Sequence, residues 1–114
     1  MIVNYTKKNL EMVRGDTLSF GMEISDDTGQ LITVDTISFA CKKTPNDTEY
    51  LFQKTLNDGI TVSSNKYVVR VSPGDTENAD LGLYSYDLEI GKNGDIFTIL
   101  VGTLKIINDI TRGE

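Results

Sequence analysis

The chain has 114 residues and a net charge of −6, it contains no histidine, and its single cysteine cannot form an internal disulfide. Nucleic-acid binding needs a basic stripe, which a chain with 11 basic and 17 acidic residues does not show. The lack of histidine removes Ser-His-Asp and Cys-His catalysis and most zinc sites. No apolar stretch approaches the roughly 20 residues of a membrane helix. We therefore expect one domain over residues 1–114, with no enzymatic activity, cofactor or metal and no nucleic-acid or membrane contact.

Apolar residues alternate with polar ones along most of the chain, which is the pattern of half-buried β-strands. Turn signals such as Asp-Thr-Gly, Asn-Asp-Gly and Asn-Gly separate the alternating segments. Only segment 73–79 has the residues of a helix start, and it is long enough for a single turn. In chain order the sequence predicts strands near residues 18–24, 37–42, 50–54, 60–62, 66–71, 84–90 and 96–107.

The tripeptide Arg14-Gly15-Asp16, which adhesion receptors read on exposed loops, stands just before the first predicted strand. Gly15 can adopt positive φ at a corner, and Asp16 can bond its own neighbouring backbone. We interpret the tripeptide as a turn with Gly15 as a structural residue, rather than as an adhesion ligand.

The remaining reactive side chains have simple structural interpretations. Cys41 lies on the same face of its predicted strand as Ile37 and Phe39. This position predicts a small buried hydrophobic side chain rather than a nucleophile. The lysines Lys42, Lys43 and Lys54 are expected to face solvent. Several aspartates lie in predicted turns without the spacing of a calcium loop, and we expect them to be solvated: Asp26, Asp27, Asp75, Asp80 and Asp95.

The run Asp80-Leu81-Gly82-Leu83-Tyr84-Ser85-Tyr86 matches the Asp-x-Gly-x-Tyr-x-Cys pattern at the start of an immunoglobulin F strand, with Tyr86 in place of the cysteine. In that setting the Tyr84 hydroxyl bonds to backbone at the corner, so Asp80, Gly82 and Tyr84 are structural residues. Together with seven or so short strands, this pattern predicts an all-β fold, an Ig-like antiparallel β-sandwich of about seven to nine strands.

The last predicted strand, 96–107, is nearly continuously apolar, and Lys105 is its only charged residue. We expect it to bend near Gly102 and to be covered on both sides for part of its length. Strict alternation places Phe97, Ile99 and Val101 on one face, which is a candidate interaction surface.

Several segments follow one another in a particular order. Arg14-Gly15-Asp16-Thr17 enters a strand of alternating Phe and aliphatic residues, and the strand 37–43 ends in paired lysines. After these come Leu51 to Lys54, Gly59 to Val62, Val69 to Thr76, Leu83 to Leu88, Leu100 to Leu104 and Asp109 to Arg112. In this order the chain resembles the small β-sandwich proteins of tailed bacteriophages and prophages, in particular the N-terminal domain of baseplate upper proteins.

The resemblance implies a structural role in a virion, exerted through protein contacts and without catalytic residues. The first expectation is therefore a tail or baseplate module, made in the bacterial cytoplasm, that contacts other tail proteins or itself. The N-terminal residues lack the apolar core of a signal peptide, which agrees with this expectation. The alternative is a host-facing or carbohydrate-binding Ig-like module, for which Tyr50 and Phe52 form the only plausible aromatic pair.

Overall fold

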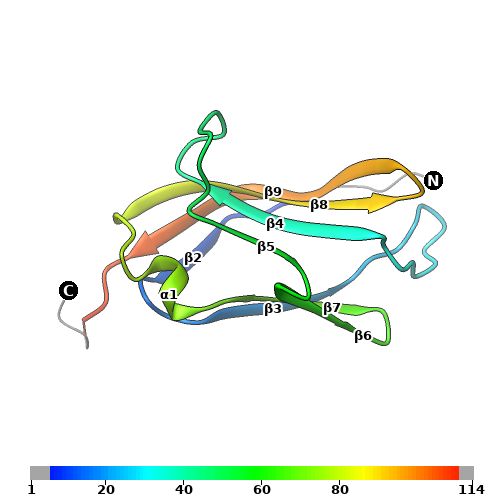
Figure 1. The fold of residues 1–114 in the computed structure, drawn as a ribbon, viewed down its shortest axis with the longest axis horizontal. Coiled ribbons are helices and arrows are strands. Elements are labelled where there is room, and N and C mark those ends of the chain that lie inside the picture. The colour runs from blue at the N-terminus through cyan, green and yellow to red at the C-terminus, as the bar shows by residue number, and fades with distance from the viewer. Residues whose placement is uncertain (1–5, 111–114) are drawn as a thin grey trace.

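The structure is a computed structural model that describes residues 6–110, and it consists of strands joined by turns and loops (Figure 1). The one helix is α1 (Pro73–Thr76), a single turn. The strands are β1 (Thr6–Lys7), β2 (Leu10–Val13), β3 (Leu18–Glu23), β4 (Thr36–Lys42), β5 (Phe52–Leu56), β6 (Gly59–Ser63), β7 (Lys66–Val71), β8 (Gly82–Lys92) and β9 (Asp95–Ile107). The predicted all-β class is confirmed. No helix among the described residues has the length and apolar character needed to cross a membrane.

The strands form one mixed sheet in the order β1-β9-β8-β4-β5-β6-β7-β3, and β2 also pairs with β9. The expectation of a wholly antiparallel arrangement is wrong, because β1 and β2 run parallel to β9 and β5 runs parallel to β6. The parallel pair β5–β6 is short, with Thr55 opposite Gly59 and Leu56 opposite Ile60. At this point the sheet turns over, so that β6, β7 and β3 lie beneath β4, β8 and β9 (Figure 1).

The core lies between these two parts of the sheet. The side chains of the core come from alternating positions along the strands. Every second residue of β4 and β7 is buried, including Phe39 and Tyr67. The Phe39 ring contacts Phe20, Phe52 and Tyr86, with centroids 5.3–5.8 Å apart. Burial of these aromatic and aliphatic side chains is the main term that stabilises the fold. Cys41 is fully buried beside them, as predicted.

The turns have the backbone geometry that their residues favour. Asn93 and Gly94 both have positive φ, 54° and 87°, at the two-residue turn between β8 and β9. Ser64 and Asn65 have positive φ at the turn between β6 and β7. Positive φ at both central residues matches the right-handed twist of the paired strands, and these turns therefore fix the register of the two hairpins.

Strand β9 departs from the predicted alternation. Leu88 lies opposite Leu100, but Glu89 lies opposite Thr98, so Ile99 is an extra residue in a bulge. A bulge reverses the side-chain parity on one side of it. Phe97, opposite Ile90, therefore shares the core face, whereas Val101, opposite Asp87, lies on the outer face. The prediction that Phe97, Ile99 and Val101 share one face is wrong, and Ile99 is itself buried in the core.

Gly102 marks a close approach of two backbone segments. A Cβ atom at this residue would clash with the carbonyl oxygen of Lys8. Lys8 and Asn9 form the break between β1 and β2, and the Lys8 amide donates to the Val101 carbonyl at 2.9 Å. The N-terminal segment therefore lies against β9 at Gly102, the one position of this strand without a side chain. This contact accounts for part of the cover that the sequence predicts for β9.

Candidate functional site

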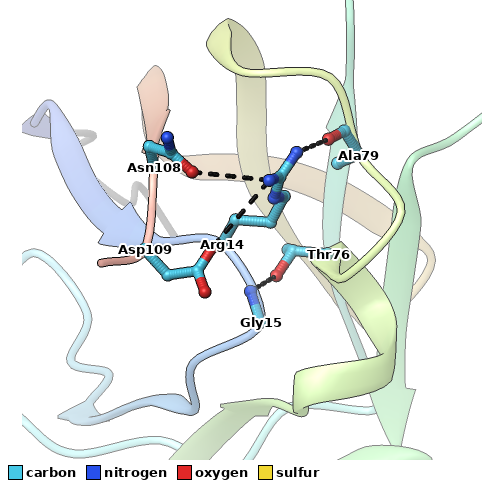
Figure 2. A network of polar contacts seen from close by, with 6 residues as sticks. All are labelled: Arg14, Gly15, Thr76, Ala79, Asn108 and Asp109. Atoms are coloured by element: carbon cyan, nitrogen blue, oxygen red, sulfur yellow. Dashed lines mark hydrogen bonds and ion pairs between the residues drawn. The ribbon is translucent and has the colours of Figure 1, made fainter. Parts of the chain in front are cut away.

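The Arg14-Gly15-Asp16 corner is a turn that contacts other segments of the chain. The Arg14 guanidinium donates to the Ala79 carbonyl and to Asn108 Oδ1, both at 3.4 Å, and lies 3.8 Å from Asp109 Oδ1 (Figure 2). The Arg14 side chain is only 19% exposed. It therefore joins the chain before β3 to the segments that follow α1 and β9, and it does not project as an adhesion ligand requires.

Gly15 has φ of +80°, as its position at a corner requires. Its amide donates to Thr76 Oγ1 at 2.8 Å, and Thr76 is fully buried at the end of α1 (Figure 2). The Asp16 amide donates to the Val13 carbonyl at 3.0 Å, which closes the turn. A residue with a Cβ atom would be strained at this φ, so glycine is needed here.

The corner before β8 contains the contact expected for Tyr84. The Tyr84 hydroxyl donates to the Asp80 carbonyl at 2.7 Å, and Gly82 between them has φ of +132°. Burial raises the pKa of Tyr84, and the neighbouring Asp80 acts in the same direction. The Asp80 carboxylate itself lies in solvent, where it pairs with Lys43 at 3.6 Å.

A groove of about 750 Å³ lies on the outer face of β9, β8 and β4. Its floor contains a cross-strand row in which Ala40, Asp87 and Val101 are neighbours on successive strands, with Gln53 and Lys7 at the two ends. We call this hollow the outer groove. Small side chains on the floor make it concave: Ser38, Ala40, Ser85 and Thr103.

The rim of the outer groove is basic, although the protein is acidic. Lys7 and Lys8 line one side, and Lys42 and Tyr50 line the other. The Lys42 ammonium lies 4.9 Å from the centroid of the Tyr50 ring, so one face of this exposed aromatic is already covered. Lysines on both sides of a concave sheet face provide hydrogen-bond donors for a polar ligand that runs across the strands.

Asp87 is the acidic group at the centre of the groove floor. Its side chain is half-buried, and this burial raises its pKa above the usual value, while nearby Lys42 acts in the opposite direction. Glu89 also lines the floor but is exposed. Gln53 donates to Ser38 Oγ at 3.0 Å and so fixes the β5 side of the floor. The carboxylates in the floor can accept hydrogen bonds and the lysines at the rim can donate them. This arrangement suits the binding of a polar ligand.

Two predictions about individual residues need correction. Lys54 was expected in solvent and Asp75 in a solvated turn, yet their side chains are 14% and 20% exposed and form an ion pair at 2.7 Å. Asp75 also accepts from the Ser72 amide at 2.7 Å. The helical turn brings Asp75 over β5, a long-range contact that local turn chemistry does not reveal.

The aromatic pair considered for carbohydrate binding is divided by the fold. Phe52 is buried against Phe39, whereas Tyr50 is 47% exposed at the rim of the outer groove. Burial also raises the pKa of Cys41 to about 12, which makes this thiol a poor nucleophile. Among residues 6–110 no cluster of three or more potential ligands could hold a metal ion.

Sequence reasoning did not identify the outer groove. Its floor residues were visible as the polar positions of alternating strands, but such positions normally face solvent without forming a hollow. The groove brings together residues of β9, β8 and β4 and residues of two segments outside them, around Lys8 and around Tyr50. A run of small residues at these outward positions, Ser38 and Ala40 followed by Ser85, was the only local signal.

No known protein-family model matches the sequence, and no curated protein matches it. Among solved structures, the chain is similar to one described as the X-ray structure of the endo-beta-1,4-mannanase from Thermotoga petrophila, with a TM-score of 0.56 and 13% sequence identity. The similarity covers 89% of this chain and 18% of the mannanase chain. At this identity the likeness concerns the fold alone, and the chain spans less than a fifth of the mannanase.

Proposed function

We propose that this protein is a non-catalytic assembly module that binds a segment of another protein in the outer groove. The observation that carries the proposal is the groove itself, a concave sheet face with lysines on both rims and Asp87 half-buried in its floor. A groove that crosses several strands offers an extended polypeptide many polar partners in succession. The groove contains no histidine, the most common general base near neutral pH, which agrees with a binding role.

For the architecture we propose an Ig-like sandwich. The strand order supports this, because β6, β7 and β3 follow the order of the D, E and B strands, and β4, β8 and β9 follow that of C, F and G. The hydrogen bond from Tyr84 to the Asp80 carbonyl supports it further, since it corresponds to the tyrosine corner at the start of an F strand. The mixed pairing of β1 and β2 with β9 then corresponds to a first strand that has moved across to the second sheet.

For the biological setting we propose the tail or baseplate of a bacteriophage or prophage, with other tail proteins as partners and the virion as the final location. The support is the order of segments from Arg14-Gly15-Asp16-Thr17 to the end of the last strand, which resembles that of baseplate proteins. A sheet fold held by a buried core without disulfides also suits assembly in the bacterial cytoplasm.

The test of this setting is the protein content of purified particles. We expect quantitative mass spectrometry of particles, induced from the strain or phage that encodes the chain, to find it in a fixed ratio to known tail proteins. The ratio should persist through density-gradient purification and a high-salt wash. Particles that contain the other tail proteins but lack this chain would contradict the proposed role.

A further inference from the structure

The charged side chains of the outer groove alternate in sign across the sheet. Lys7 on β1 lies opposite Val101 on β9, which in turn lies opposite Asp87 on β8. Lys42 follows on β4, one strand further across. A path along the floor from β1 to β5 therefore passes a cation, then a carboxylate, then a second cation.

These charges are not paired with one another among residues 6–110. Lysines outside the groove do form ion pairs, Lys43 with Asp80 and Lys54 with Asp75, whereas no lysine of the groove is joined to a carboxylate. The Lys42 ammonium lies over an aromatic ring instead. The groove therefore contains opposite charges whose partners come from solvent or from a ligand.

Asp87 is the group in the groove that gains most from a partner. Burial raises its pKa, and Lys42 opposes this shift without cancelling it, so the charged carboxylate is less stable here than in water. A ligand that covers the floor excludes more water, which strengthens an ion pair and penalises an unpaired charge. The floor thus favours a ligand with a basic group at its centre.

The width of the sheet determines how far apart the charges of such a ligand are. Neighbouring strands lie about 4.8 Å apart, so the two strand spacings from β1 to β8 amount to about 10 Å. An extended chain covers this distance in about three residues. The whole path from β1 to β5 is four spacings, or about 19 Å, which an extended chain covers in about six steps along its backbone.

We propose that the outer groove binds an extended segment of about seven residues, with a basic side chain over Asp87 and a carboxylate on each side, one at the Lys7–Lys8 rim and one at Lys42. The inference rests on the proposed function and specifies the chemistry of the bound segment. Because this segment is acidic at both ends and the protein has a net charge of −6, overall attraction does not select it. Selection depends on the local order of charges.

Two synthetic peptides with blocked ends test this order. The first is Glu-Ser-Ser-Arg-Ser-Ser-Glu, and the second is Arg-Ser-Ser-Glu-Ser-Ser-Arg, in which the charges are exchanged. The net charge of the protein repels the first peptide and attracts the second. A preference for the first peptide therefore comes only from the charges of the groove.

The measurement is the shift of backbone amide NMR signals when the purified protein is titrated with each peptide. We expect the first peptide to bind with a Kd of about 1 mM and to shift the signals of Ala40, Asp87 and Val101. The second peptide should bind at least about threefold more weakly.

Asp87→Asn tests the central contact, and it should weaken binding of the first peptide by about three- to fivefold. Asp95→Asn is the matched control, because it removes the same charge from the exposed start of β9, outside the groove. It should change the affinity by less than about 1.5-fold.

Three results would overturn the inference: binding of the second peptide as tight as that of the first, an Asp87→Asn variant that loses no more affinity than Asp95→Asn, or an absence of peptide-induced shifts in the groove. Each is distinct from a failure of the proposed function, which appears as a lack of binding by every tail protein. The comparison of the two peptides uses the wild type alone, so it decides even if a variant does not fold.

Discussion

The hydroxyl of Tyr86 donates a hydrogen bond of 2.6 Å to the carbonyl of Lys8, 78 residues earlier in the chain. The Tyr86 ring packs against Phe39 in the core, while its hydroxyl reaches past Gly102 to the break between β1 and β2. One side chain therefore fixes the position of the N-terminal segment, and with it the Lys7–Lys8 rim of the outer groove.

We expect Tyr86→Phe to lower the free energy of unfolding by about 1 kcal/mol, because the Lys8 carbonyl loses its partner. The midpoint of thermal unfolding should fall by a few degrees. Tyr84→Phe is the matched comparison, since its bond to the Asp80 carbonyl is local. Only Tyr86→Phe should speed exchange of the Lys8 amide, which bonds to Val101. Equal exchange at Lys8 in both variants would show that Tyr86 does not hold this segment.

The Arg14-Gly15-Asp16 corner predicts different responses at two neighbouring positions. Gly15→Val should reduce stability by about 1–3 kcal/mol, because a β-branched residue is strained at φ of +80°. Asp16→Glu should leave cells that bear adhesion receptors as indifferent as the wild type does. Chemical denaturation and a cell-attachment assay measure the two effects. Attachment that depends on Asp16 would contradict the structural interpretation of the tripeptide.

The ion pair between Lys54 and Asp75 is largely shielded from water, and its loss should be costly. We expect Lys54→Met to lower the free energy of unfolding by about 1–3 kcal/mol, because Asp75 keeps its charge without its partner. Lys66→Met, at an exposed lysine, should change it by less than about 0.5 kcal/mol. A double-mutant cycle with Asp75→Asn measures the coupling directly. A coupling energy near zero would mean that the pair contributes nothing to stability.

Alkaline pH should reveal the buried thiol. The pKa of Cys41 is about 12 in the folded protein, above the thiol's usual 9.0. The stabilisation from keeping the thiol neutral is thus fully present below pH 9.0 and is lost as pH rises toward 12. In this window each pH unit lowers the free energy of unfolding by up to about 1.4 kcal/mol through this group. Cys41→Ala should show a shallower decline, measured by urea unfolding at pH 8 to 10.5. Identical slopes would contradict a protected thiol.

The hairpins and the core could be predicted from the sequence, because their signals are local. The segment 66–71 was predicted with the bounds that β7 has, and the buried alternation of Tyr67, Val69 and Val71 is confirmed. The bulge at Ile99 could not be predicted, since it depends on how β8 and β9 pair rather than on the apolar run itself. The short strands β1 and β2 were also missed, because parallel pairing with β9 leaves little local pattern.

The outer groove could not be predicted from the sequence, for the same reason. Ala40, Asp87 and Val101 are far apart in the chain, and only the strand order β9-β8-β4 makes them neighbours. Burial raises the pKa of Asp87, whose neighbours on β4 and β9 are distant in the sequence. Local reasoning therefore identified the residues that build the sheet, whereas the binding face depends on long-range pairing.

The most direct test of the central claim is calorimetric titration of the purified protein with the tail proteins encoded by the adjacent genes. Ala40→Arg places a large side chain beside Asp87 in the groove floor, and Thr61→Arg places the same side chain on an exposed strand of the other part of the sheet. We predict that one of these proteins binds the wild type, that Thr61→Arg binds it with unchanged affinity, and that folded Ala40→Arg loses at least about tenfold in affinity, or roughly 1.4 kcal/mol. Equal binding by Ala40→Arg and the wild type, or no binding by any tail protein, would contradict the proposal that the outer groove is the docking face of an assembly module.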